Sequence, residues 1–226
     1  MEFFLDILRS VAYGVIEGIT EWLPISSTGH MILAEQVLKF SFSTEFMEMF
    51  RVVIQLGAIL AVVVLYFKKL WPFCADNGRD SGFSRHFRWP VVRLWCKIIV
   101  ACVPAAVLGL LLDDWLDAHL YNSITVALML IIYGIAFIMI ERRPRVPTTT
   151  KLSRITYKQA LIVGAWQVLA LIPGTSRSGS TIIGGLLCGM SRPAASQFTF
   201  FLAIPVMAGA SGLKLVKFLA KGGVFT

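Results

Sequence analysis

The chain has 226 residues, of which 57% are hydrophobic and 15% are charged, and its formal net charge is +8. Because soluble domains carry about 25% charged residues, this composition excludes an ordinary soluble globular protein and indicates a polytopic membrane protein. The basic residues are concentrated beside apolar runs, where membrane topology accounts for them, so we expect no nucleic-acid partner.

The apolar residues form long runs along the chain. The clearest are Val52–Phe67, Ile98–Leu112 and Ser123–Ile140, and a further span is expected near Phe198–Gly212. Each approaches the roughly 17–25 residues that a membrane-spanning helix needs, so flanking residues are expected to complete it. We therefore predict an all-α, multi-pass integral membrane protein with residues 1–226 in a single membrane domain.

Lysine and arginine are unevenly distributed among the connecting segments. Seven lie within Lys68–Lys97 and six within Glu141–Lys158, whereas Asp113–Asn122 contains none. Short cytoplasmic loops carry an excess of these residues. Because an even number of spans separates the two basic segments, we place both in the cytoplasm and Asp113–Asn122 outside.

The segment Arg142–Lys151 is rich in Pro and Thr and predicts a solvated linker between two halves, approximately 1–122 and 123–226. The halves resemble each other weakly at an offset of 150 residues. This offset pairs Gly14 with Gly164, Glu17 with Gln167, Ser26 with Ser176 and Gly29 with Gly179. Both halves contain a polar motif, a short apolar piece and then a full span, which is typical of an inverted-topology repeat.

Pro24 and Pro173 interrupt the helical pattern in each half, and both are followed by clusters of Ser, Thr and Gly. Irregular backbone is tolerated at membrane depth only where protein buries it or where it lines a wet cavity. We therefore predict two re-entrant helix hairpins whose polar loops meet in the membrane. Loop amides and a helix N-terminus would there form a site for an anion.

The first polar motif is EGITEWLPISSTGH, which spans Glu17–His30. Glu17 and Glu21 are four residues apart, so they share one face of a helix, about 40° apart around its axis. Two carboxylates in a membrane are costly unless protonation or a divalent cation between them neutralises their charge. The alternative is that they solvate a helix end at the interface, where Trp22 would belong to the aromatic belt.

The same motif contains the run Ser26, Ser27, Thr28, Gly29 and His30. A hydroxyl near an imidazole is the minimum set for nucleophilic attack with proton transfer. Ser27 and His30 share a helical face if a helix begins near Ser26. Helix capping is the alternative role for the hydroxyls, but it does not explain the histidine or the upstream glutamates.

The second polar motif is PGTSRSGST, which spans Pro173–Thr181. Its Arg177 stands among serines and glycines in an apolar hairpin and presents a planar fork that suits phosphate oxygens. The alternative is an arginine that reaches a lipid headgroup, but this role does not require the surrounding PGxSxSG pattern. The two motifs together predict a phosphate-bearing substrate and a divalent cation.

Both motifs closely resemble the signature motifs of the bacterial undecaprenyl-diphosphate phosphatases of the bacitracin-resistance type. VIQLGAILAVV and SRPAASQFTFFLAIPVM resemble the same family, so the resemblance covers nearly the whole chain. It implies an enzyme of the bacterial plasma membrane that removes the terminal phosphate of undecaprenyl diphosphate, recycles this lipid carrier for cell-wall synthesis and gives bacitracin resistance. It also implies a Mg²⁺ or Ca²⁺ requirement and a site that opens toward the outer face.

The resemblance also implies roles for individual residues. Glu17 and Glu21 would serve the cation and the pyrophosphate, and Arg177 would hold the phosphate. Ser27 and His30 would be nucleophile and acid/base, and which of them attacks is left open. The other residues expected to bind substrate are Ser26, Thr28, Gly29, Gly174, Ser176, Ser178, Gly179 and Thr181. A monomer and a homo-oligomer are both compatible with this reading.

Family members usually continue with further membrane helices beyond the segment that here ends at Thr226, so we expect the second half to be truncated at its C-terminus. A polyprenyl-phosphate transporter or flippase is the alternative function, because re-entrant hairpins in an inverted repeat are also found in transporters. A phosphatidic-acid-phosphatase type of enzyme is disfavoured. That family needs a histidine six residues after a Ser-Arg pair, where this chain has Ile183 and Phe198.

Overall fold

The structure, a computed structural model, describes residues 2–74, 86–120, 122–142, 146–220 and 222. In these ranges the regular elements are helices, which confirms the predicted all-α class. They are α1 (Glu2–Thr20), α2 (Ser27–Leu38), α3 (Thr44–Val53), α4 (Gln55–Leu65), α5 (Phe67–Leu70), α6 (Trp89–Leu120), α7 (Ser123–Glu141), η2 (Leu152–Arg154), α8 (Tyr157–Gln167), η3 (Val168–Leu171), α9 (Arg177–Leu187) and α10 (Arg192–Ala220).

In the described residues, four stretches are long and apolar enough to cross a membrane. They are Thr44–Leu65 in α3 and α4, Trp89–Leu112 in α6, Ile124–Glu141 in α7 and Arg192–Ala220 in α10. Each overlaps a predicted span, which confirms the multi-pass prediction. One boundary differs, because α6 continues to Leu120, so most of the expected connection Asp113–Asn122 is helical.

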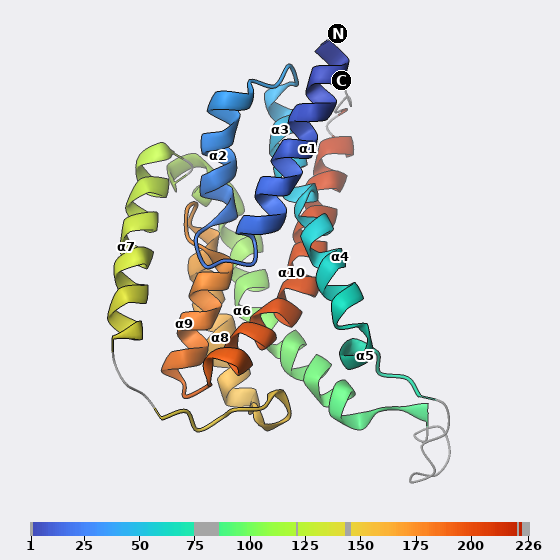
Figure 1. Ribbon diagram of the computed structural model, residues 1–226, viewed down its shortest axis with the longest axis vertical. Helices are drawn as coiled ribbons and strands as arrows, with labels where there is room; N and C mark the ends of the chain where they lie inside the picture. The colour runs from blue at the N-terminus through green and yellow to red at the C-terminus, as the bar shows by residue number, and fades with distance from the viewer. Residues whose placement is uncertain (1, 75–85, 121, 143–145, 221, 223–226) are drawn as a thin grey trace.

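Two helix pairs form hairpins that enter the molecule from opposite ends (Figure 1). The first, α1 and α2, runs from one end to the middle and returns to the same end, while α8 and α9 do the same from the other end. The turns at Pro24 and Pro173 lie at the tips of these hairpins, where the predicted interruptions fall. Helices α6, α7 and α10 and the α3–α4 pair extend past the level at which the tips meet.

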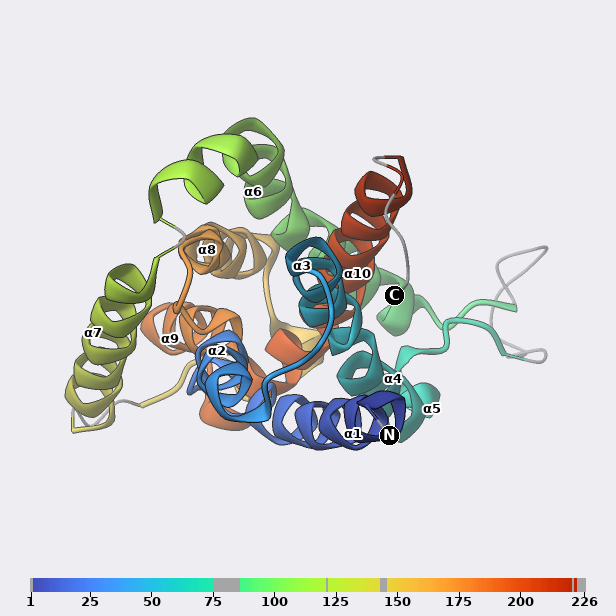
Figure 2. The same ribbon diagram turned by 90° about the horizontal axis from the view of Figure 1, so that it is seen from above.

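The main core lies where α6, α8 and α10 pack together. Ile98 and Ala101 of α6 and Phe198 and Phe201 of α10 are completely buried there. The packing of α8 on α6 is close, because a Cβ atom added to Gly164 would lie 2.3 Å from the Ala101 carbonyl oxygen. Seen from above, α7 lies at one edge of the molecule, beyond α2, α8 and α9 (Figure 2).

Polar contacts attach the first hairpin to α3. Tyr13 of α1 is completely buried and donates a hydrogen bond to Glu35 of α2. The same Glu35 carboxylate forms a 2.7 Å ion pair with Arg51 of α3. Both side chains of this pair are partly exposed, at 18% and 20%, and the two contacts link α1, α2 and α3 through one carboxylate.

Candidate active site

The tips of the two hairpins are joined by direct contacts between the two motifs. Arg177 Nη2 lies 2.5 Å from Glu21 Oε1, and the side chains of these two residues are only 14% and 7% exposed. The hydroxyl of Ser178 lies 3.3 Å from the carbonyl oxygen of Leu23, to which it can donate. Residues 156 positions apart in the sequence therefore form one buried polar cluster.

The turn before α2 is held by Ser26. This residue has φ 64° and ψ 96°, a combination that residues other than glycine rarely adopt and that is typical of functional turns. Its hydroxyl accepts a hydrogen bond from the Gly29 amide at 3.4 Å and so caps α2. Helix capping was the alternative role predicted for the hydroxyls of this motif. The cap places Ser27 at the first position of the helix, inside the cluster.

Ser27 is directed at a carboxylate. Its hydroxyl donates to Glu21 Oε2 at 2.6 Å, and both residues are buried. Glu21 thus holds Ser27 with one oxygen and Arg177 with the other. A carboxylate that accepts a hydrogen bond from a serine hydroxyl is placed to act as the base that removes its proton.

His30 is oriented by the backbone of the same turn. Its Nδ1 lies 2.9 Å from the carbonyl oxygen of Ser26. A carbonyl can only accept, so Nδ1 carries the hydrogen in the neutral ring and Nε2 keeps its lone pair. The hydroxyl of Ser27 is paired with Glu21 instead, so the predicted hydroxyl–imidazole pair is not the contact that this structure forms.

Glu17 is the most deeply buried acid of the cluster. It is 1% exposed, and in the described part of the chain neither carboxylate oxygen has a hydrogen-bond partner. It lies beside the carboxylate of Glu21 and the hydroxyl of Ser27, within electrostatic range of Arg177. A buried carboxylate without partners is costly, so Glu17 fits a cation that would use its free oxygens.

The acidic ligands do not complete a cation site by themselves. Among the described residues, no group of three or more His, Cys, Asp or Glu side chains could hold a metal ion. Mg²⁺ is commonly bound by one or two carboxylates together with water and substrate phosphates. The pair Glu17 and Glu21 fits this pattern.

The second tip presents donors toward the same space. Ser176 caps α9 by accepting from the Gly179 amide at 3.0 Å, and its hydroxyl also contacts that of Ser178 at 3.1 Å. Arg177 Nη1 is buried and has no hydrogen-bond partner in the described residues. One nitrogen of the guanidinium is therefore paired with Glu21 while the other is available to an anion.

Thr181 lies one turn further along α9 and is completely buried. Its hydroxyl donates toward the Arg177 carbonyl at 2.9 Å and accepts from Thr199 of α10. This position supports the first turn of α9 behind Arg177. Its predicted contact with substrate stays a prediction.

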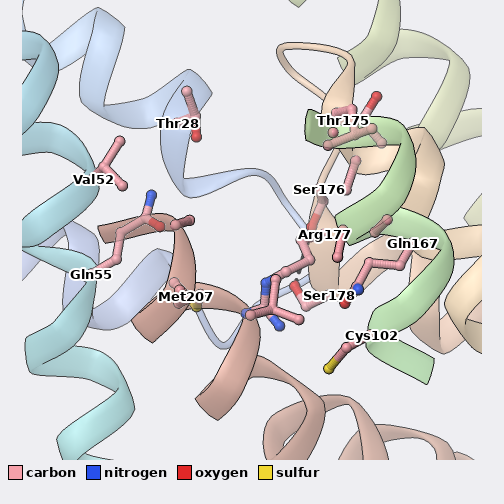
Figure 3. A pocket seen from close by; sticks show the side chains of 18 of the residues that line it. Thr28, Val52, Gln55, Cys102, Gln167, Thr175, Ser176, Arg177, Ser178 and Met207 are labelled. Carbon is pink, nitrogen blue, oxygen red and sulfur yellow. Dashed lines mark hydrogen bonds between the residues drawn. The ribbon is translucent and has the colours of Figure 1, made fainter. Parts of the chain in front are cut away.

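A cavity of about 630 Å³ opens beside the joined tips (Figure 3). Its polar end is formed by residues of both motifs: Glu21, Ser26, Ser27, Thr28, Thr175, Ser176, Arg177 and Ser178. The rest of its lining is mainly apolar and comes from α6, η3 and α10, with Ala105, Leu110, Leu171, Val206 and Leu213 among the residues. A polar end that continues into an apolar cavity suits an amphiphile with a charged head and a hydrocarbon chain.

The glycines of the motifs lie against α7. Added Cβ atoms would approach α7 to 2.6 Å at Gly174, 3.1 Å at Gly179 and 3.3 Å at Gly29, where they would meet Val126, Phe137 and Leu130 respectively. Gly174 also has φ 86°, so it needs glycine for its backbone conformation as well. The structure thus packs these glycines against a neighbouring helix, and their expected contact with substrate stays a prediction.

Tyr133 and Gln167 belong to the surroundings of the site, although the motifs did not point to them. Tyr133 of α7 accepts a 2.7 Å hydrogen bond from Ser180, and both side chains are buried. Gln167, at the end of α8, lines the cavity. The weak internal repeat could have identified Gln167, because it pairs this residue with Glu17, which was predicted to belong to the site.

Residues 10–225 match the sequence pattern of the family described as Bacitracin resistance protein BacA. The chain is 59% identical over 224 residues to a protein of Enterococcus faecalis named Undecaprenyl-diphosphatase, which covers 98% of this chain and 79% of the relative. Proteins of the same name from Streptococcus sanguinis and Lactococcus lactis are 56% and 54% identical over 222 residues each. These two alignments cover 97% and 96% of this chain and 77% and 78% of the relatives.

Proposed function

The chain belongs to the bacitracin resistance protein BacA family, and we infer from this membership that it is a membrane-bound undecaprenyl-diphosphatase. It hydrolyses undecaprenyl diphosphate to undecaprenyl phosphate and inorganic phosphate, which is the activity associated with bacitracin resistance. The observation that supports the joined tips as its active site is the chain of contacts from Ser27 through Glu21 to Arg177. These contacts combine a nucleophile, a base and a phosphate-binding cation in one buried cluster.

Ser27 is the nucleophile that the geometry favours. Its Oγ would attack the terminal phosphorus while Glu21, 2.6 Å away, takes its proton. The bond between phosphorus and the bridging oxygen breaks, and undecaprenyl phosphate leaves. Water then attacks the phosphoserine, His30 Nε2 takes a proton from the water, and Glu21 returns its proton to Ser27 Oγ as phosphate is released.

His30 is the alternative nucleophile, because its Nε2 retains a lone pair. The two routes leave different covalent intermediates. Rapid quenching of the enzyme with a substrate labelled in its terminal phosphate would yield an acid-stable adduct on Ser27 or an acid-labile adduct on His30. A histidine adduct that persists in the Ser27→Ala variant would refute the serine route.

Glu17 and Glu21 would hold the divalent cation, Mg²⁺ or Ca²⁺. When bound, this ion neutralises negative charge on the diphosphate. The chain's own part is to supply the two carboxylates and to keep Glu17 free of other partners. Arg177 would bind the phosphate from the other hairpin through Nη1 while Nη2 stays on Glu21.

We further propose that the hairpins are re-entrant, that the two halves form an inverted repeat and that the site opens to the outer face. Residues 146–156, which precede α8 and include Lys151 and Arg154, lie at the end of the molecule opposite the start of α1, and the short helix α5 lies toward the same end (Figure 1). If that basic end is cytoplasmic, the α1–α2 hairpin enters from outside. Labelling of Lys39→Cys in intact cells by an impermeant thiol reagent, with Lys151→Cys unlabelled, would support this orientation, and the reverse result would overturn it.

A polyprenyl-phosphate transporter is the second candidate, and the meeting of two opposed hairpins in the middle of the molecule favours it. A transporter needs the anion site but no nucleophile paired with a base. The deciding experiment measures phosphate release from a prenyl diphosphate by the purified protein in detergent, with and without chelator. Chelator-sensitive release supports the phosphatase. Transport of a polyprenyl phosphate in liposomes without any phosphate release would instead support the transporter.

A further inference from the structure

Gln167 is a buried amide whose polar atoms are unpaired within the part of the chain that the structure describes. It is the last residue of α8 and is 2% exposed. In the described residues neither its Oε1 nor its Nε2 has a hydrogen-bond partner, although the residue lines the cavity beside the tips. Figure 3 shows its side chain extending toward Arg177 and Ser178. An unpaired buried amide is unfavourable, so an occupant of the cavity is the natural partner for it.

Two further donors of the same hairpin share this condition. Thr175 Oγ1 and Arg177 Nη1 are both buried, both lack a partner in the described residues, and both residues line the same cavity. Together with Gln167 Nε2 they give the residues that line the cavity an amide, a hydroxyl and a guanidinium nitrogen without partners in the described residues. Three donors without acceptors of their own are typical of a site for an anion.

The position of Gln167 identifies which part of the substrate it meets. In Figure 3 the end of its side chain lies beside Arg177 and Ser178, at the polar end of the cavity, and Cys102 of α6 lies on its other side. Ala105 and Ala106, one turn further along α6, belong to the apolar lining. In a prenyl diphosphate, the phosphate esterified to the prenyl chain lies between the terminal phosphate and the hydrocarbon. We propose that Gln167 binds this proximal phosphate. The proposal rests on the phosphatase function stated above.

The corresponding position of the other hairpin strengthens the assignment. Glu17 is paired with Gln167 by the weak repeat and is likewise buried, and its carboxylate oxygens also lack a hydrogen-bond partner among the described residues. A carboxylate at the first position suits a cation, whereas an amide at the second donates hydrogen bonds without adding a negative charge beside phosphate. Glutamine at position 167 therefore follows from what the site must bind.

The test uses product inhibition, because the two products separate the two phosphates. Farnesyl phosphate carries only the phosphate esterified to its prenyl chain, and inorganic phosphate represents the terminal one. For Gln167→Leu we expect the inhibition constant of farnesyl phosphate to rise about 10- to 100-fold, the loss expected for a hydrogen bond to a charged group. The inhibition constant of inorganic phosphate should stay within about 2-fold, since Arg177 is unchanged.

Gln167→Glu should raise the inhibition constant of farnesyl phosphate at least as much, because it places a carboxylate against the phosphate. Gln36→Leu, at an exposed position of α2, is the matched control and should change neither constant. Equal changes in both constants for Gln167→Leu, or no change in either, would overturn the assignment.

Thermal unfolding in detergent separates a binding role from a structural one. Leu at position 167 removes two unpaired polar atoms, so the ligand-free variant should unfold at the same temperature as the wild type or higher. A lower unfolding temperature together with unchanged inhibition would mean that Gln167 is structural. If the wild type releases no phosphate, the proposed function fails. Direct calorimetric binding of farnesyl phosphate to wild type and Gln167→Leu then still tests this assignment.

Discussion

Replacement of Arg177 by lysine tests the chemical link between the two motifs. Arg177 uses Nη2 for Glu21 at 2.5 Å, and its buried Nη1 has no partner in the described residues. Lysine keeps the positive charge but concentrates it on one nitrogen. That nitrogen cannot occupy both positions of the fork, so it can neutralise Glu21 or hold the phosphate but not both.

The size of the effect follows from this geometry. If Arg177 acts on the phosphate, its loss removes one donor that stabilises the transition state, worth about 2.7–4 kcal/mol or a 10²–10³-fold fall in kcat. If it only balances the charge of Glu21, lysine retains most of the interaction and kcat should fall less than about 5-fold. Alanine is a poorer test, because leaving Glu21 uncompensated in a buried pair costs about 3–5 kcal/mol of stability.

The assay is phosphate release from a prenyl diphosphate by purified protein in detergent, with folding checked by thermal unfolding. Arg192→Lys is the matched control, because Arg192 also forms an ion pair, with Glu141, but the two side chains are 63% and 49% exposed. This change should leave kcat within about 2-fold, since exposed pairs contribute little. A folded Arg177→Lys variant with a kcat close to that of the control would refute a direct role for Arg177 at the phosphate.

The remaining predictions concern the cation, the packing beneath the site and the helix beside it. Chelator should abolish phosphate release, and Glu17→Gln should raise the cation concentration needed for half-maximal rate at least about 10-fold, as measured by Mg²⁺ titration; an unchanged titration curve would exclude Glu17 as a ligand. Gly164→Ala should lower the free energy of unfolding by about 1–3 kcal/mol, because its Cβ would lie 2.3 Å from the Ala101 carbonyl oxygen. Gly57→Ala, which meets nothing within 4 Å, should be neutral or stabilising by up to about 1 kcal/mol, and equal losses in both variants would contradict this packing. Tyr133→Phe should cost about 1 kcal/mol in denaturant unfolding by losing its hydrogen bond to α9, with kcat within about 3-fold; a loss of activity without loss of stability would place Tyr133 in the chemistry instead.

The sequence predicted those features that depend on local composition. Long apolar runs define the spans whatever their neighbours are, so Ser123–Ile140 was placed to within a residue or two of Ile124–Glu141. Likewise, Pro24 and Pro173 are unfavourable inside a helix, and both lie in the tips, shortly after α1 and η3 end.

Features that depend on the conformation of a turn or on which helix faces meet were not predictable in this way. Ser27 and His30, three residues apart, were expected to share one helix face. The observed partner of the Ser27 hydroxyl is Glu21, since the strained turn at Ser26 brings α1 and α2 together. The role of Tyr133 likewise depends on α7 packing against α9, and an apolar run carries no information about which of its faces meets a neighbour.

The charges of the site explain why the two motifs occur together in one chain. Glu17, Glu21 and Arg177 give the buried tips one positive and two formal negative charges, with one pair already formed. A diphosphate entering alone would meet two carboxylates, and a divalent cation entering alone would lie near the guanidinium, so each faces repulsion that the other relieves. With both present, opposite charges alternate from the carboxylates through the cation and the phosphates to Arg177. The acidic motif and the basic motif are thus complementary parts of one site, which only a cation and an anion together complete. For this reason the first motif carries excess negative charge and the second carries excess positive charge.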